Sequence, residues 1–411
     1  MKNNYLQLIK SHPATLTFGA NHYFFSSIGQ SFFLSLFIPF FMERVGISHD
    51  GFSYYYALAS FFGGLMLSFI GPIVDQVDVR KYGYFNGLLC ALCCIWMAHI
   101  HQPWMLLIGL AGLRLSGQGM MPLAGAAAMG KYFHHNRGKA LAVAALGMSV
   151  GEILAPIFLV ALLQYLPWKT LWYWLAIFEG IIFPLSSFLL VGKEPAFAKT
   201  ALKKGEEKSR QFVKTLLTSG SFWIWGLLFV FTPFLAAGVM IHHHALLNIK
   251  GWTVTHYALG FTGFGVARIV ISLMAGPMVD RFSAGKISPF LLLPLSLGMI
   301  LLHWFEGEWV LFLFLLILGG TLSFGSICGT AYWAEIYGPE KMGTAKSMVS
   351  TLMVFACAAA PVIFVPLFKA SFFPWTFPFL LMLAVVLSFA ASKTRPVSTE
   401  EPEVLAPKEE V

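Results

Sequence analysis

Long apolar runs separated by short polar turns repeat along the chain from residue 14 to residue 392. Each run is about 20 residues long, which is the length that a helix needs to cross the hydrocarbon core of a bilayer. Charged residues, glycines and prolines mark the turns between the runs. The pattern predicts twelve membrane-spanning helices, at 14–42, 52–71, 83–100, 104–129, 140–163, 171–191, 221–243, 254–275, 288–304, 309–331, 346–368 and 374–392.

The composition excludes a soluble fold. Of the 411 residues, 57% are hydrophobic and only 11% are charged, whereas soluble proteins carry roughly 25% charged residues. The five cysteines lie in the apolar runs, where buried thiols are a better interpretation than a metal or redox site. We therefore expect an all-α polytopic membrane protein without a cofactor.

The distribution of Lys and Arg predicts the orientation. If the termini and every second loop are placed in the cytoplasm, 21 of the 27 basic residues lie on that side. The opposite side carries only Arg44, Lys169, Lys250 and Lys369. The positive-inside rule then predicts both termini in the cytoplasm. Because the excess of positive charge follows this rule, the net charge of +8 does not indicate a nucleic-acid partner.

One long polar stretch divides the chain. We expect an N-terminal six-helix bundle over 1–192, a cytoplasmic central loop over 193–219, a C-terminal six-helix bundle over 220–393 and a disordered cytoplasmic tail over 394–411. The central loop is either a helix on the membrane surface or a solvated loop. The tail is rich in Pro and Glu, which is typical of disorder.

The two predicted bundles repeat each other at an offset of 205 residues. Gly46 matches Gly251 at this offset, and Pro156 matches Pro361. The polar loop GPIVDQVDVRK, which starts at Gly71, likewise matches GPMVDRFSAGK, which starts at Gly276. Copies of six helices each have the same orientation, which is the parallel repeat of one transporter architecture.

These two loops resemble the signature motif of the major facilitator superfamily, which occurs once in each half. The matching residues are Gly71, Asp75, Arg80 and Lys81 in the first copy, and Gly276, Asp280, Arg281 and Lys286 in the second. The resemblance covers the chain from the first helix to the last. It implies two parallel-repeat bundles and a cytoplasmic gate at these loops, with basic residues that pair across the two halves.

A narrower similarity concerns the fourth, fifth and eighth helices. The segment from Arg114 through Arg137-Gly138 to Gly147 resembles the corresponding region of monocarboxylate and oxalate/formate-type transporters. The segment GFGVARIVISLMAGPMVD is similar to the one that holds the carboxylate-binding arginine of that group, which implies this role for Arg268. The chain departs from the proton-linked members by having Phe264 where they carry an aspartate.

Three charged residues inside the apolar runs are the main candidates for function, because a charge at the bilayer centre costs about 2.5–3.5 kcal/mol. Arg268 presents a fork of donors suited to a carboxylate. Arg114, with Gln118 one turn further on, either contacts substrate or pairs with Glu152. Glu152 is a candidate for proton coupling or a permanent counter-ion of Arg114. At the repeat offset these three residues match Gly63, Gly319 and Cys357, which favours a substrate role over a fold role.

Histidines are the remaining candidates for proton transfer. His22 begins a polar stripe that continues through Ser26 to Gln30, so this face of the first helix is expected to line a cavity. We expect His22 to be a proton-coupling residue and Gln30 a substrate-binding one. The consecutive histidines at 242–244 point about 100° apart on a helix and cannot all bind one ion, so no metal site is expected.

The sequence therefore predicts a secondary active transporter that works by alternating access. Two intramembrane arginines favour a small organic anion as the substrate, carried with protons or by exchange. The alternative is a carrier of an amino acid, a siderophore or a drug-like compound, in import or efflux. We expect a monomer in the lipid bilayer of the inner (cytoplasmic) membrane. A membrane enzyme or a transporter-like sensor is less consistent with so few intramembrane titratable groups, and no GxxxxGK[ST] motif for nucleotide binding is present.

Overall fold

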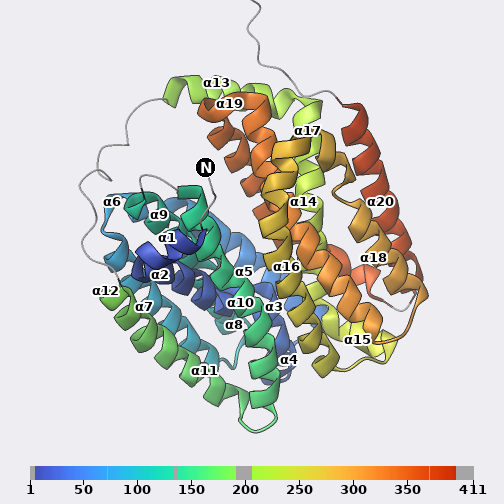
Figure 1. Ribbon diagram of the computed structural model, residues 1–411. Helices are drawn as coiled ribbons and strands as arrows, with labels where there is room; N and C mark the ends of the chain where they lie inside the picture. The colour runs from blue at the N-terminus through green and yellow to red at the C-terminus, as the bar shows by residue number, and fades with distance from the viewer. Residues whose placement is uncertain (1–4, 72, 134–136, 191–205, 370, 395–411) are drawn as a thin grey trace, which may run out of the picture.

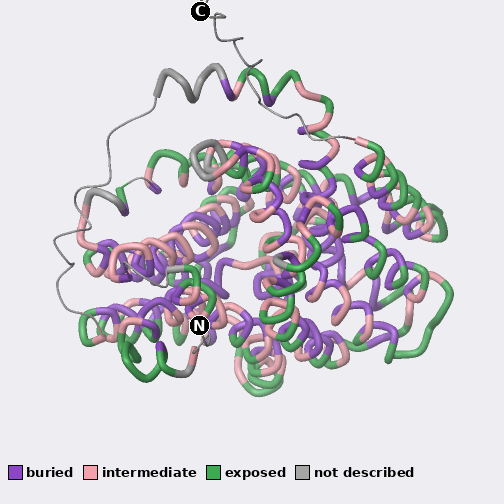
Figure 2. The backbone as a smooth tube through the Cα atoms, turned by 45° about the horizontal axis from the view of Figure 1, so that its top comes forward, coloured by how far each residue is buried: buried purple, intermediate pink, exposed green. Residues whose placement is uncertain are grey.

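The computed structural model describes residues 5–71, 73–133, 137–190, 206–369 and 371–394 (Figure 1). Within these ranges the regular structure is entirely helical. The helices before the central loop lie on one side of the molecule and those after it on the other, as the colour gradient of Figure 1 makes visible. Figure 2 shows buried segments running through the interior, while exposed positions recur along the outer helices.

In its described residues, the first half contains twelve α-helical segments. They are α1 (Tyr5–Ser11), α2 (Pro13–Phe25), α3 (Ser31–Leu34), α4 (Ile38–Val45), α5 (His49–Ile70), α6 (Ile73–Gln76), α7 (Val79–Ala98), α8 (Pro103–Leu113), α9 (Met121–Tyr132), α10 (Arg137–Leu163), α11 (Trp168–Ile177) and α12 (Phe183–Leu190). Two π-helical segments, Arg114–Met120 and Phe178–Ile182, join α8 to α9 and α11 to α12. Short 3₁₀ segments at Ser26–Gly29 and Ser35–Phe37 connect α2, α3 and α4.

The second half begins with the linker helix α13 (Glu206–Thr218). The helices that follow are α14 (Gly220–Ile241), α15 (His243–Lys250), α16 (Val254–Phe282), α17 (Ala284–Ile287), α18 (Leu293–Trp304), α19 (Trp309–Leu367) and α20 (Phe373–Lys393). A 3₁₀ turn at Ser288–Phe290 joins α17 to α18. The long helix α19 reverses at Gly338, whose φ of 68° and ψ of 172° interrupt the helix between two membrane spans.

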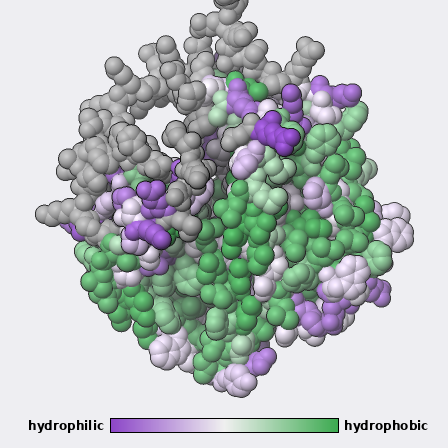
Figure 3. All heavy atoms as spheres, in the orientation of Figure 1, coloured by the Kyte–Doolittle hydropathy of each residue, from purple (hydrophilic) through white to green (hydrophobic). Residues whose placement is uncertain are grey.

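The structure has helices at all twelve predicted places. Nine helices of the described ranges are long and apolar enough to cross a membrane, or ten if the bent pair Pro13–Gly29 and Ser31–Val45 counts as one span. The two other predicted places are α7 and the π-interrupted series α8–α9. Figure 3 shows a broad hydrophobic belt on the visible face between more polar ends. These features confirm an all-α polytopic membrane fold.

The first predicted helix, 14–42, is not continuous, and this detail of the prediction is wrong. The two parts meet at an angle of 42°, because Gln30 adopts an extended conformation with φ −83° and ψ 152°. Gly29, just before the break, packs directly on Gly117 of the first π-helix. A Cβ at Gly117 would lie 2.7 Å from the Gly29 nitrogen, so neither position leaves room for a side chain.

The repeat is visible in the backbone. Gly46 ends α4 and Gly251 ends α15, and both adopt the left-handed conformation, with φ of 72° and 70°. Glycine enters this region without the steric cost of a Cβ. This pair, which matches at an offset of 205, thus ends a helix in the same way in each half.

The central loop is helical where it is described. In α13, Phe212 and Leu216 are buried, and the Phe212 ring lies 5.2 Å from that of Tyr337 in α19. This agrees with the helical alternative for 206–218. Residues 191–205 lie outside the described residues, and so do residues 395–411 of the tail for which we expect disorder over 394–411.

Candidate functional site

A cavity of about 520 Å³ lies between the two halves. Its walls come from α5, α10 and the first π-helix on one side and from α14, α16 and both spans of α19 on the other. Four residues predicted to bind substrate line it, namely Arg268, Arg114, Gln118 and Gln30, and so does the proton-coupling candidate Glu152. Residues far apart in sequence therefore meet at one place.

The cavity extends from the middle of the molecule toward the Gly338 end. On α19 its lining runs from Thr321 to Trp333 and again from Lys346 to Cys357, on both sides of the Gly338 reversal. The opposite end is closed by contacts between the halves. There the rings of Phe32 and Phe261 lie 5.6 Å apart.

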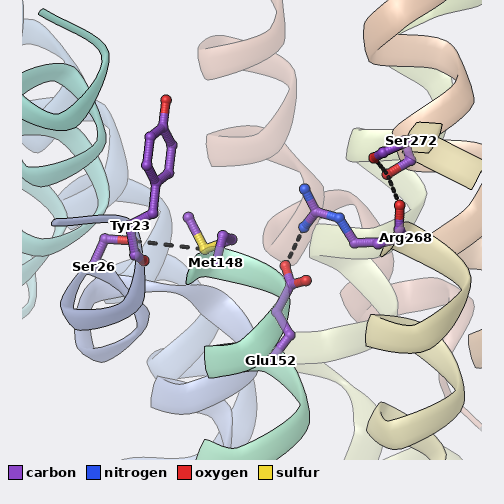
Figure 4. A network of polar contacts seen from close by, with 7 residues as sticks. Tyr23, Ser26, Met148, Glu152, Arg268 and Ser272 are labelled. Atoms are coloured by element: carbon purple, nitrogen blue, oxygen red, sulfur yellow. Dashed lines mark hydrogen bonds and ion pairs between the residues drawn. The ribbon is translucent and has the colours of Figure 1, made fainter. Parts of the chain in front are cut away.

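Glu152 and Arg268 form an ion pair across the two halves at the cavity wall (Figure 4). Nη1 of Arg268 in α16 donates to Oε1 of Glu152 in α10. The Glu152 side chain is 4% exposed and that of Arg268 is 28% exposed, so the cation has more contact with the cavity than the anion. Oε2 of Glu152 and Nε of Arg268 have no hydrogen-bond partner among the described residues.

Arg114 is held by its own half of the molecule. Its Nη1 donates to the carbonyl of Gly29 at 3.2 Å and lies 3.4 Å from Oγ of Ser31. Its guanidinium carbon lies 5.3 Å from the centre of the Tyr56 ring. The alternative in which Arg114 pairs with Glu152 is wrong, because Glu152 pairs with Arg268. Instead, Arg114 binds a carbonyl at the break in the first helix.

Arg114 and Gln118 stand four residues apart in the π-helix Arg114–Met120, and both line the cavity. A π-turn widens the helix and is frequent at functional sites. Two hydroxyl groups of the lining are also available to a ligand. Oγ of Ser60 and Oγ1 of Thr232 are buried and have no partner in the described part of the chain. The wall can therefore donate to a polar, negatively charged ligand from several directions.

His22 lies outside this cavity, which corrects the predicted polar stripe. Its side chain is buried in α2, where Nδ1 hydrogen-bonds the carbonyl of Phe18 at 2.8 Å and the ring lies 4.8 Å from that of Phe183. Ser26 does not line the cavity either. Its Oγ donates to the carbonyl of Tyr23 at 2.6 Å and to Sδ of Met148 at 3.6 Å (Figure 4). The bend at Gln30 leaves only the end of the stripe at the cavity.

The gate loop of the first half is held by local contacts. Arg80 pairs with Asp78 at 2.8 Å, two residues away. Hydrogen bonds from Arg80 hold the pKa of Asp78 below its ordinary value. Lys131 donates to the carbonyls of Val74 and Val77 at 2.7 and 3.0 Å. Gly71 precedes α6, Lys81 is exposed, and the side chain of Asp75 is outside the described residues.

The gate loop of the second half is bound by an acidic residue of another helix. Glu335 of α19 accepts hydrogen bonds from the backbone nitrogens of Ala284 and Gly285 at 2.8 and 3.1 Å. Arg281 is exposed and lies over the ring of Phe282 at 5.1 Å. Gly276 lies within α16, Lys286 is exposed, and the side chain of Asp280 is outside the described residues. The contacts seen for Asp78–Arg80 and Glu335 stay within one half.

The sequence contains one match to the G-x-S-x-G pattern of serine hydrolases, at Gly147–Gly151. That pattern needs a sharp strand-to-helix turn to expose its serine, whereas these residues lie inside α10. The glycines serve packing. A Cβ at Gly147 would overlap the backbone of Ala20, and one at Gly151 would overlap Oγ of Ser27.

Sequence reasoning missed several polar or aromatic residues of the cavity wall, among them Lys346 and Trp333. Lys346 stands at the edge of an apolar run, so by sequence it counts among the basic residues of a cytoplasmic loop. The spacing of Lys346, Ser350, Met353 and Cys357, all of which line the cavity, is that of one helix face. This periodicity is the signal that could have identified it.

Comparison with solved structures shows the same fold at low identity. A point variant of the nucleoside transporter NupG has a TM-score of 0.74 at 14% identity and covers 92% of this chain and 98% of its own. An inward-facing, unoccupied bacterial homologue of the human lysosomal transporter Spinster has a TM-score of 0.67 at 14% identity, with 95% and 98% covered. No curated protein sequence matches the chain.

The family comparison covers almost the entire chain. The model of the Major Facilitator Superfamily matches twice, over residues 22–243 and 233–411. The two matches agree with the sequence repeat, and the cavity lies between the halves that they define. The chain belongs to the Major Facilitator Superfamily and is a multi-pass membrane transporter of the alternating-access type.

Proposed function

We propose that this protein carries an organic anion of the carboxylate type, and that Arg268 is its principal binding residue. The observation that carries the proposal is the ion pair of Arg268 with Glu152 at the wall of the central cavity. A substrate carboxylate offers the guanidinium the same acceptor atoms as Glu152 does, with the same fork geometry. It can therefore replace Glu152 as the partner of Arg268.

Charge balance supports a negatively charged substrate. Arg114, Arg268 and Lys346 line the cavity, and Glu152 is its acidic lining residue. Uncompensated positive charge in a low-dielectric site is costly, and a bound anion reduces this cost. Because Arg114 remains bonded to the Gly29 carbonyl, it contributes its remaining donors and its field.

Glu152 gives the carrier a means of coupling to protons. When a substrate carboxylate takes its place at Arg268, the Glu152 carboxylate loses its counter-ion and remains buried. A buried, unpaired carboxylate is stabilised by taking up a proton. Substrate and proton would then cross together, while exchange of one anion for another would need no net proton movement.

The test is uptake into liposomes that contain the purified protein, together with thermal-shift assays over a panel of carboxylates. We expect at least one carboxylate to raise the unfolding temperature of the wild type. In Arg268→Gln this shift should be absent. Arg281→Gln is the matched control for binding in the thermal-shift assay, since Arg281 lies on the same helix and does not line the cavity. Binding that survives Arg268→Gln would refute the proposal.

Coupling is tested separately with Glu152→Gln. We expect this variant to keep anion exchange and to lose accumulation driven by a pH gradient. Retention of gradient-driven accumulation would exclude Glu152 as the proton carrier, without affecting the assignment of Arg268.

The same ion pair also favours a second candidate, a zwitterion such as an amino acid. Its carboxylate could bind Arg268 while its ammonium group binds Glu152, and a cavity of about 520 Å³ with Trp333 in its wall has room for a large side chain. Glu152→Gln distinguishes the two candidates. For a zwitterion, this substitution removes the partner of the ammonium group and should weaken binding. For an anion, it removes only a competitor for Arg268, so binding should be kept.

We further propose that the protein acts as a monomer in the cytoplasmic membrane, with α13 and the gate loops in the cytoplasm. The excess of Lys and Arg on that side supports this orientation, in which the cavity extends toward the cytoplasm. The orientation is tested with an engineered cysteine in the exposed loop at Tyr165. A thiol reagent that does not cross the membrane should modify it when added to intact cells, and protection of the cysteine would contradict the orientation.

A further inference from the structure

Four histidines gather at the end of the molecule opposite the cavity mouth. His49 belongs to α5 in the first half, while His242, His243 and His244 stand at the junction of α14 and α15 in the second half. The rings of His49 and His242 lie 4.8 Å apart and bridge the halves. Those of His243 and His244 lie 4.0 Å apart. We call these four residues the histidine cluster.

The surroundings of the cluster suit neutral imidazoles. His242 donates through Nε2 to the carbonyl of Pro361 at 2.8 Å, and His243 donates through Nδ1 to the carbonyl of Met240 at 2.9 Å. The Nε2 atoms of His49, His243 and His244 are buried and have no partner among the described residues. A protonated ring has two N–H donors, and these second donors would lack an acceptor.

Aromatic side chains complete the packing of the cluster. The His242 ring stacks on Phe368 at 5.4 Å and His243 stacks on Tyr257 at 4.3 Å. Among the described residues, two charged groups stand beside the cluster, namely Asp50, which follows His49 in α5, and Lys369, which follows Phe368 at the end of α19. These two lie 3.6 Å apart, so the Asp50 carboxylate already has a cationic partner.

In alternating access, this end of the molecule must open when the cavity end closes. Opening separates His49 from His242 and Asp50 from Lys369, since each pair joins the two halves. The imidazoles then reach water, where both ring nitrogens can be solvated and protonated. In the closed arrangement protonation adds unpaired donors and repulsion among adjacent rings.

We propose that the histidine cluster is a proton-operated lock, which holds this end of the carrier closed while its rings are neutral and releases it when they are protonated. In the predicted orientation the lock faces the outside, so external acid favours the outward-open state. The proton here acts on the conformational equilibrium and does not cross with the substrate. The proposal depends on alternating access and is independent of the nature of the substrate.

The cluster is not a metal site. In the described part of the chain, no three or more His, Cys, Asp or Glu side chains are arranged so that they could hold a metal ion. Consecutive residues 242–244 project in different directions. The proton is therefore the ligand that the geometry of these rings can take.

The test measures the distance between spin labels across this end by double electron-electron resonance. Labels at Gln164 and Glu306, both exposed, report opening in the purified full-length protein without substrate. A histidine with a pKa near 6.5 in the open state shifts the equilibrium about tenfold between pH 7.5 and 5.5, if it must be neutral when the end is closed. We expect the ratio of the long-distance to the short-distance population of the wild type to rise by at least this factor.

Variants assign the effect to the cluster. We expect His49→Phe with His242→Phe, which keep aromatic rings against Phe368, to reduce the pH response at least tenfold. His256→Gln is the matched control, because His256 lies at the same end and pairs with Glu308 outside the cluster. Should the double Phe variant fold poorly, His244→Gln alone serves as the test, and we expect it to reduce the pH response by a smaller factor. A wild type whose distances do not change with pH, or a cluster variant with an unchanged response, would overturn the proposal.

Discussion

The ion pair of Glu152 and Arg268 predicts that removing one partner destabilises the protein more than removing the other. Removing one partner of a buried ion pair costs about 3–5 kcal/mol, because the other charge is left uncompensated. Glu152 is 4% exposed, so Arg268→Gln leaves a carboxylate that water does not reach, and we expect a loss of about 3 kcal/mol. Arg268 is 28% exposed, so Glu152→Gln leaves a cation that the cavity water can solvate, at a cost of about 1 kcal/mol.

The assay is thermal unfolding of the detergent-purified protein, followed by the fluorescence of its 12 tryptophans. For a chain of 411 residues the conversion is about 1–2 °C per kcal/mol. Arg268→Gln should then lower the unfolding temperature by about 3–6 °C and Glu152→Gln by about 1–2 °C. The double variant removes both charges and should lose less than the sum of the single losses. Equal single losses, or strictly additive ones, would refute the reasoning.

Three further predictions concern parts of the molecule outside this pair. Gly117→Ala places a methyl group 2.7 Å from the Gly29 nitrogen and should cost about 1–3 kcal/mol in thermal unfolding, unlike Gly138→Ala, whose Cβ meets nothing within 4 Å. Both carboxyl oxygens of the buried Glu179 lack a partner among the described residues, so Glu179→Met should leave the unfolding temperature unchanged or raise it; a clear drop would reveal an unseen partner. The lowered pKa of Asp78 means that its contribution to stability is present above its unfolded pKa of about 3.9 and is lost as the pH falls through the folded value. Asp78→Asn should therefore cost less than about 1 kcal/mol at pH 7 and nothing once the pH lies below the folded-state pKa of Asp78, measured as unfolding temperature against pH.

The number and placement of helices followed from the sequence because the bilayer imposes a length on each apolar run. Arg268, Arg114 and Glu152 were found for a related reason, since an intramembrane charge must face the interior or a cavity. The repeat then showed that each was absent from the other half, and the structure brings all three to one cavity.

The partners of these charges could not be predicted. Arg114 binds Gly29 because the first helix breaks there, and the break depends on the contact between Gly29 and Gly117 in another helix. Periodicity along one helix carries no information on such a contact. The same bend removed His22 from the cavity, since a regular helix through Gln30 would have kept the whole stripe on one face.

The two arginines of the cavity differ in whether their contacts stay within one half of the protein or join the two halves. Arg114 packs against Gly63 and binds Gly29, both within its own half, so its contacts travel with that half as a rigid part. Arg268 binds a residue of the opposite half, so its contact must be broken and remade in each cycle. The free-energy difference between the two states can then be adjusted at this pair, as it can at the histidine cluster, while the rest of the cavity wall stays unchanged. Selection on transport rate would act first on Glu152 and its neighbours, because small changes there alter how long the carrier waits on each side of the membrane.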